Sequence, residues 1–172
     1  MIALIIVWAI LSSILFNSIL EWIIHGPLEH GKISVLIGQR KSHIDHHYFY
    51  WREEGFQNMK HGKSVAIPHW FFIPVSLISL GVASVIGHFL GSTLFVWCFV
   101  VTTMIHYIFF QYVHTSMHIP KGRWIERTKW FKKKMAEHVI HHRMDEDFEH
   151  PVNICVVCSW ADRLFGTYFR RK

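Results

Sequence analysis

The stretch His43-Ile44-Asp45-His46-His47 places three histidines within five residues. Positions i, i+3 and i+4 share one face of an α-helix, so a helix here would direct all three imidazoles toward one point. The same spacing returns later in the chain, at His138, His141 and His142. The repeated H-x-x-H-H spacing favours two histidine-bearing helices that face a common site.

Two closer pairs of histidines accompany these clusters, and each pair follows an apolar run. The four clusters consist of His25 and His30; His43, His46 and His47; His114 and His118; and His138, His141 and His142. Neutral imidazole is a ligand for iron, zinc, copper and nickel. A single zinc ion takes about four ligands, so ten clustered histidines predict a site for two metal ions.

The composition indicates a membrane protein. Apolar residues make up 51% of the chain and aromatic residues 16%, whereas charged residues make up only 17%, against about 25% in soluble domains. Three apolar runs, approximately 2–24, 67–90 and 92–112, have the ~20-residue length of a transmembrane helix. We therefore predict an all-α integral membrane helical bundle with about three transmembrane helices, formed by residues 1–172 as a single domain.

The order of the three runs brings the four clusters to one side of the membrane. The first run ends at His25, and the hairpin of the second and third runs returns the chain at His114. Residues 25–66 and 113–172 then form a histidine-rich cap. All 18 lysines and arginines fall in these cap segments, so by the positive-inside rule the cap lies on the cytoplasmic face. A bacterial inner membrane and the endoplasmic reticulum both fit this orientation.

Two local features shape the expected cap. Gly26 and Pro27 stand between the first two histidines and predict that the first helix kinks or ends there. Residues 123–134 alternate aromatic and basic residues, which predicts a helix in the membrane interface with its lysines directed to water or anionic headgroups. We attribute the net charge of +6 to basic residues on the cytoplasmic side of the membrane and to their attraction to anionic lipids. The sequence contains no motif for nucleic-acid binding.

The histidines outside the four clusters are assigned other roles. We expect three of them not to be metal ligands: His61, His69 and His88. His106 precedes His114 by eight residues, about 12 Å along a helix, where it would line a substrate cavity or hydrogen-bond to another helix. His150 precedes a proline. It is a candidate for contact with one of the metal-binding histidines rather than for binding the metal itself.

Metal-bound histidines usually donate their second N–H to a carboxylate or a carbonyl. Five residues lie close enough in sequence to accept such a bond: Glu21, Asp45, Glu137, Asp145 and Asn153. Glu21 stands one helical turn before His25 and is expected to accept from that ring. Cys155 and Cys158 lack the two further ligands of a structural zinc site, which favours a packing role for them.

The order H-x4-H, H-x2-H-H, H-x3-H and H-x2-H-H, followed by Asn153 and by Asp162-Arg-Leu-Phe-Gly-Thr-Tyr168, resembles the fatty acid hydroxylase/sterol desaturase superfamily. The likeness covers Glu21 to Tyr168. It implies an integral-membrane oxygenase with a dinuclear metal centre, normally iron, on the cytoplasmic side. Carried over by position, the catalytic metal ligands would be His25, His30, His43, His46, His47, His114, His118, His138, His141 and His142.

The resemblance implies that two iron ions and O2 hydroxylate an unactivated C–H bond of a lipid, whether fatty acyl, sterol-like or isoprenoid. Zinc would be a possible occupant in purified samples. Electrons would come from a separate donor, such as a ferredoxin or cytochrome b5. A carotenoid ring hydroxylase and a lipid desaturase with the same site remain alternatives. A non-catalytic metal-binding or metal-transport membrane protein is a further alternative, although transporters usually place their ligands near the bilayer midplane.

Overall fold

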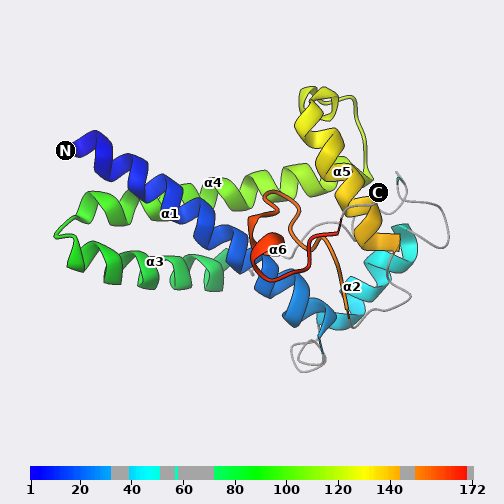
Figure 1. Ribbon diagram of the computed structural model, residues 1–172, viewed down its shortest axis with the longest axis horizontal. Helices are drawn as coiled ribbons and strands as arrows, with labels where there is room; N and C mark the ends of the chain where they lie inside the picture. The colour runs from blue at the N-terminus through cyan, green and yellow to red at the C-terminus, as the bar shows by residue number, and fades with distance from the viewer. Residues whose placement is uncertain (32–38, 51–56, 58–71, 144–149, 170–172) are drawn as a thin grey trace. The chain divides into compact units, whose positions relative to one another are not determined.

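The computed structural model describes residues 1–31, 39–50, 57, 72–143 and 150–169, with the backbone alone for residues 39–42 (Figure 1). All regular elements within these ranges are helices, which confirms the all-α prediction for the described part of the chain. In chain order they are α1 (Ile2–Ile23), η1 (Ile24–His30), α2 (Gln39–Tyr48), α3 (Phe72–Phe89), α4 (Thr93–His118), η6 (Trp124–Arg127), α5 (Lys129–Arg143) and α6 (Trp160–Leu164).

The chain divides into two compact units, which are described separately. The first unit comprises Met1–Asn17 and Ile67–Phe109, and the second comprises Ser18–Ala66 and Phe110–Lys172. Helices α1 and α4 each contribute to both units. The single domain over residues 1–172 stays a prediction.

Three helices are long and apolar enough to cross a membrane: Ile2–His30, Phe72–Phe89 and Thr93–His118. They correspond to the three predicted spans, and this number suggests a membrane protein. The first and third helices extend beyond the predicted ends, to His30 and His118, so both carry histidines in their last turns. Residues 67–71 of the predicted second span lie outside the described residues.

Helices α3 and α4 form the tight antiparallel hairpin predicted around Gly91 (Figure 1). Gly91 has a φ of 59°, a left-handed conformation that glycine adopts without steric cost. Gly87 allows the two helices to approach closely, because a Cβ there would lie 2.4 Å from Cγ2 of Val96. The hydroxyl of Ser92 accepts a hydrogen bond from the Phe95 N–H and caps α4.

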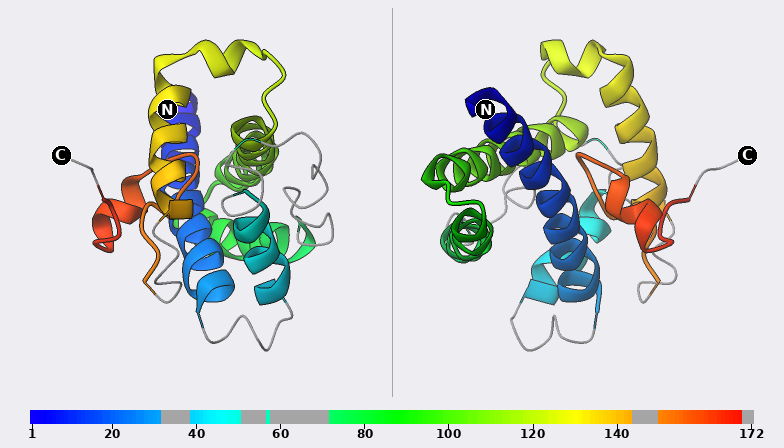
Figure 2. Two further views of the ribbon diagram at one scale, coloured as in Figure 1. Left: turned by 90° about the vertical axis from the view of Figure 1, so that its right-hand side faces the viewer. Right: turned by 60° about the vertical axis from the view of Figure 1, so that its left-hand side comes forward.

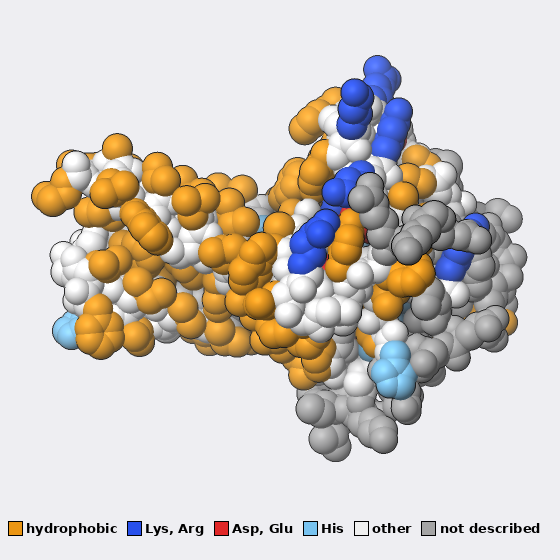
Figure 3. Space-filling model, in the orientation of Figure 1, with side chains coloured by type: hydrophobic (Ala, Val, Ile, Leu, Met, Phe, Trp, Pro, Cys, Tyr) orange, Lys and Arg blue, Asp and Glu red, His pale blue; other side chains and the backbone are white. Residues whose placement is uncertain are grey.

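The first unit packs α1, α3 and α4 around a small apolar core that includes Ala9, Ala83 and Phe99. A buried polar network joins α1 to α4 within this unit. Ser13 Oγ lies 3.1 Å from Thr103 Oγ1, and Asn17 Nδ2 donates to the same oxygen at 3.2 Å. Outward-facing side chains of these helices are predominantly apolar (Figure 3), as expected of helices that contact lipid.

Of the two outcomes expected at Gly26 and Pro27, a kink or an end of the helix, the end is not found. The first helix continues through both residues as the π-helical turn η1. Proline lacks the N–H that an α-helical hydrogen bond requires, and widened turns of this kind are common where a helix contributes to a functional site. The continuation places His25 and His30 in one continuous element.

The basic segment 123–134 also differs from the predicted single helix. It forms the short 3₁₀ turn η6 and then α5, which begins after Thr128, whose Oγ1 accepts the Phe131 N–H. Lys129, Lys132 and Lys133 are exposed, as expected for lysines that face water or headgroups. Lys134, by contrast, is only 4% exposed, because it points into the second unit and pairs with Glu137 at 2.7 Å.

Candidate metal centre

All ten histidines of the four clusters belong to the second unit, and each is at most 9% exposed. They come from four helical elements: η1, α2, the end of α4 and α5. Helix α2 packs against η1 (Figure 2). Burial of ten polar rings is costly unless their nitrogens have partners, so the arrangement requires a chemical explanation.

Nine of the ten histidines form two groups, and within each group one ligand atom per residue lies within 4.8 Å of all the others. The five-histidine group consists of His25, His30, His43, His47 and His141. The four-histidine group consists of His46, His114, His118 and His138. Among the described residues, no carboxylate or thiolate joins either group. Both groups could hold a metal ion.

The two groups adjoin one another, because the repeated H-x-x-H-H clusters divide between them. On α2, His47 belongs to the five-histidine group and His46 to the other, with ring centroids 5.6 Å apart. On α5, the rings of His138 and His141 stack at 5.5 Å, and they again belong to different groups. Each of these helices therefore contributes to both sites.

The tenth histidine, His142, lies between the two groups. Its ring stacks on His47 of the five-histidine group at 4.1 Å and lies 4.8 Å from His118 of the four-histidine group. His142 is fully buried. Its position permits it to serve either ion.

The π-helical turn explains how the H-x4-H pair works. In an α-helix, residues five apart are rotated by about 140°, since each residue turns about 100°. In a π-helix the hydrogen bonds run from i to i+5, which stacks these positions. The rings of His25 and His30 accordingly lie 5.8 Å apart in the same group.

Close contacts between ring nitrogens indicate where ions would sit. His43 Nε2 lies 2.8 Å from His30 Nε2 and 2.9 Å from His47 Nε2, and His118 Nε2 lies 3.0 Å from His138 Nε2. Two imidazole nitrogens bound to one ion at about 2.1 Å and at right angles would be about 3.0 Å apart. The observed contacts match such pairs of neighbouring ligands.

One close contact and one hydrogen bond at the periphery involve Nδ1 atoms of the five-histidine group. His43 Nδ1 lies 3.2 Å from Glu29 Oε2, and His141 Nδ1 lies 2.8 Å from the carbonyl oxygen of Val152. Because a neutral imidazole has a single N–H, donation from His141 Nδ1 leaves the lone pair of its Nε2 directed into the five-histidine group.

Sequence reasoning missed both partners. Glu29 is adjacent to His30, but the expected helix break between His25 and His30 gave no reason to direct its side chain toward His43. Val152 acts through a backbone carbonyl, for which the sequence carries no signal. A continuous π-helix over residues 24–30, had it been considered, would have placed Glu29 among the candidates for contact with a histidine.

Some buried ring nitrogens have no hydrogen-bond partner among the residues that the structure describes. This is true of both nitrogens of His46 and of His141 Nε2. An unsatisfied buried imidazole nitrogen costs about 1–3 kcal/mol, and a metal ion would remove this cost. The donor set therefore fits metal ions at both groups.

Burial also keeps the rings in the form that binds metal. Desolvation, together with the other imidazoles, lowers the pKa of His43, His46, His47, His138 and His142 well below the usual value. Desolvation lowers the pKa of His141 to about 4. Only the neutral ring can offer a lone pair to a cation, so these six histidines are ready to bind at neutral pH.

None of the remaining candidates that the structure describes belongs to either group. His88 and His150 are exposed, and His106 is half-buried in the first unit on α4. His61, His69 and Asp145 lie outside the described residues. Asp45 is half-buried on α2. The expected bond from His25 to Glu21 is absent, because Glu21 Oε1 accepts the N–H groups of Val156 and Val157 instead.

Cys155 and Cys158 are not disulfide-bonded and join neither group. The Cys155 thiol is buried and donates a hydrogen bond to the carbonyl of Ser18. Burial, with Glu21 and Asp162 nearby, raises the pKa of the Cys155 thiol far above its usual value. A thiol that stays protonated is unsuited to metal or redox chemistry, which agrees with the predicted packing role.

No family model, no curated protein and no solved structure matches this chain. Fold and site together define a class: a helical protein with three candidate membrane spans and buried histidine groups that could bind metal. Membership of the fatty acid hydroxylase/sterol desaturase superfamily stays a prediction from the order of the histidine clusters.

Proposed function

We propose that this protein is a membrane-bound oxygenase of the fatty acid hydroxylase/sterol desaturase type. It would hold two iron ions and hydroxylate an unactivated C–H bond of a lipid with O2 and electrons from a separate donor. The observation that carries this proposal is the adjoining pair of histidine groups, five members in one and four in the other, with His142 between them.

The number of donors favours a reactive site over a structural one. A structural zinc site is closed by four ligands in a tetrahedron. The described groups contain no thiolate, the ligand that most structural zinc sites use. Nine or ten neutral nitrogens shared between two adjoining positions suit ions of higher coordination number, such as iron.

The residues of the chain would bind, orient and shield the ions. The rings of the five-histidine group would hold one ion and those of the four-histidine group the other. The Val152 carbonyl holds His141 in the required tautomer, and Glu29 lies beside Nδ1 of His43. Burial of all ten rings excludes bulk water from the site. When bound, a pair of redox-active ions would supply the capacity to activate O2.

The position of four proposed ligands at the ends of candidate membrane spans supports a lipid substrate. His25 and His30 end the first candidate span, and His114 and His118 end the third. Four proposed ligands thus occupy the last turns of apolar helices, where a bilayer-resident chain could approach. A transporter would be expected to bind its ion near the middle of a span.

The deciding experiment is turnover of the full-length protein, purified anaerobically with ferrous iron. Reductant-dependent O2 uptake would be measured with a fatty acyl, a sterol and an isoprenoid lipid, with mass spectrometry for a product 16 Da heavier. One lipid should give coupled uptake and product, and His46→Ala should abolish both. His88→Ala, the same change at an exposed histidine, is the matched control and should be active.

Two bound ions without O2 uptake under any reductant or lipid would instead favour the non-catalytic metal-binding protein. A product two hydrogens lighter than the substrate would favour the desaturase. Retained activity in His46→Ala would remove the four-histidine group from the proposed site.

A further inference from the structure

The C-terminal segment Val152–Val157, called the strap below, lies against the five-histidine group. Its first residue supplies the carbonyl that accepts from His141 Nδ1 at 2.8 Å. Its third residue, Ile154, packs on the π-helical turn so tightly that a Cβ on Gly26 would lie 3.0 Å from its Cδ1. The strap thus contacts two of the elements that supply ligands to this group.

Every backbone N–H from residue 153 to 157 is held by a particular partner. The acceptors are the Thr167 carbonyl for Asn153, the Asp162 carboxylate for Ile154 and Cys155, and the Glu21 carboxylate for Val156 and Val157. All five of these backbone donors are therefore satisfied, although the segment belongs to no helix.

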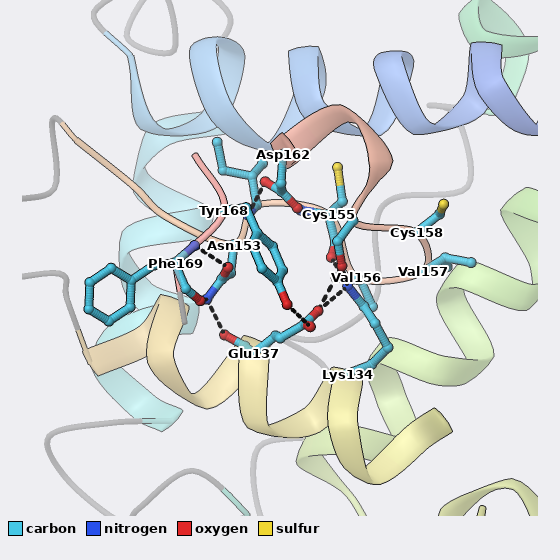
Figure 4. Close-up of polar contacts among 12 residues, drawn as sticks. Lys134, Glu137, Asn153, Cys155, Val156, Val157, Cys158, Asp162, Tyr168 and Phe169 are labelled. Carbon is cyan, nitrogen blue, oxygen red and sulfur yellow. Dashed lines mark hydrogen bonds and ion pairs between the residues drawn. The ribbon is translucent and has the colours of Figure 1, made fainter. Parts of the chain in front are cut away.

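Asp162 accepts hydrogen bonds through both of its carboxylate oxygens. Its side chain is fully buried, its Oδ1 accepts from Ile154 N at 2.9 Å, and its Oδ2 accepts from Cys155 N at 3.1 Å. Thr167 donates to Oδ1 as well, at 2.8 Å. Figure 4 shows this carboxylate beside Cys155.

On the opposite side the strap is held by α5, the helix that carries His141. Lys134 Nζ donates to the Cys155 carbonyl at 2.7 Å and pairs with Glu137 Oε2, and Tyr168 donates to Glu137 Oε1 (Figure 4). The carbonyl that orients His141 therefore belongs to a segment clamped between α5 and Asp162.

We infer that Asp162 is a positioning residue for His141, acting through the strap. Its carboxylate fixes the amides of Ile154 and Cys155, and their position sets that of the Val152 carbonyl. That carbonyl holds the proton of His141 on Nδ1 and leaves Nε2 free to bind an ion. Asp162 itself belongs to neither histidine group. The inference rests on the proposed metal site, but not on oxygenase activity.

The test measures metal binding by the full-length protein in detergent micelles. Cobalt(II) is titrated under nitrogen, its visible spectrum reports histidine coordination, and elemental analysis counts the ions. In Asp162→Asn, one side-chain oxygen is replaced by an NH2 group that cannot accept from a backbone N–H. We expect one of two cobalt sites to weaken about 10- to 100-fold, as for other outer-shell changes, while the second site keeps its affinity.

Three further variants show whether the effect passes through His141. His141→Ala should weaken the same site, and the double variant with Asp162→Asn should be no weaker than His141→Ala alone. Glu126→Gln is the matched control, because this carboxylate also accepts from backbone N–H groups, of Lys121 and Gly122, but within its own turn. It should leave both sites unchanged.

Equal affinities in wild type and Asp162→Asn would overturn the inference, and so would an equal loss at both sites. If Asp162→Asn does not fold, Thr167→Val removes only one donor to the carboxylate and should produce a smaller loss at the same site. Wild-type protein that binds fewer than two ions would overturn the proposed metal centre together with the inference. Two wild-type ions with no effect of either variant would overturn the inference alone.

Discussion

The carboxylate of Glu29 lies 3.2 Å from Nδ1 of His43, across the contact between the π-helical turn and α2. The Nε2 atom of the same ring lies within 3 Å of two other histidine nitrogens. A carboxyl group behind a histidine is a common outer support of a metal ligand, and burial raises the pKa of Glu29 to about 8. Glu29 is therefore expected to affect metal binding without being a ligand.

Replacement of Glu29 by alanine should weaken one of the two metal sites by about 10- to 100-fold. Glu29→Gln should cost less, because the amide keeps a polar side chain of the same size beside Nδ1. Cobalt or iron titration of the purified protein measures both. Asp45→Ala removes a half-buried acid from α2 and is the control. Equal affinities in Glu29→Ala and Asp45→Ala would contradict the assigned role.

Loss of Lys134 should destabilise the second unit strongly. Its ammonium group donates to Glu137, Cys155 and Ser159 at 2.7 Å each. Although burial opposes ionisation, Lys134 and the nearby hydrogen bonds hold the pKa of Glu137 below its usual value. Lys134→Met would leave this carboxylate buried without a cation, at a cost of about 3–5 kcal/mol. Unfolding in a denaturing detergent measures the loss.

Lys133→Met provides the comparison for this variant. Lys133 precedes Lys134 on the same helix but is exposed, so its loss should change the free energy of unfolding by less than about 0.5 kcal/mol. An equal loss of unfolding free energy in both variants would contradict a stabilising role of the buried Lys134–Glu137 pair.

The polar network of the first unit should contribute measurably to helix association. Thr103→Val removes the hydroxyl that lies 3.1 Å from Ser13 Oγ and accepts from Asn17. Interhelical hydrogen bonds in membrane proteins contribute about 0.6 kcal/mol on average, and up to about 1.7 kcal/mol. Thr102→Val is the control, because the Thr102 hydroxyl donates only to the Cys98 carbonyl of its own helix. Unfolding curves should separate the two variants.

Acidification should destabilise the metal-free protein. Burial lowers the pKa of His141 to about 4 and holds the pKa of His46 and His142 well below 6.5. In the unfolded chain these rings bind protons near the ordinary pKa of about 6.5. Below this pH the unfolded state binds more protons, so stability falls as the pH falls toward 4.

Each such histidine should contribute about 1.4 kcal/mol per pH unit to this slope. Unfolding free energies between about pH 7.5 and pH 5 test the expectation, and His88→Gln, at an exposed site, should leave the slope unchanged. Bound metal should shift the loss to lower pH, because protons must displace the ion. A stability independent of pH would contradict the buried, neutral histidines.

The sequence predicted those parts of the fold that depend on local periodicity. Apolar runs of the right length predicted three long helices, and the i, i+3, i+4 spacing of His43, His46 and His47 predicted a helical face. The π-helical turn was missed because Gly26 and Pro27 favour a break in any α-helix. In the folded protein the helix continues through both residues and packs against Ile154 and α2, contacts that the sequence does not reveal.

The tertiary contacts of the site could not be predicted from the sequence, because they join elements that are far apart in the chain. That His46 and His47 belong to different groups depends on the placement of α4 and α5 around α2. Lys134 was expected at the surface with its neighbours, but the strap folds over α5 and buries it. Glu29 and the Val152 carbonyl act across elements far apart in the chain, and no spacing rule links them to His43 or His141.

The most direct test of the central claim is the number of iron ions that each variant binds. Wild-type protein reconstituted anaerobically with ferrous iron should hold two ions per chain by elemental analysis. His46→Ala and His30→Ala, which each alter a different histidine group, should each retain about one ion, and His88→Ala should retain two. A single ion in the wild type, or the loss of the same ion in both variants, would contradict a dinuclear centre.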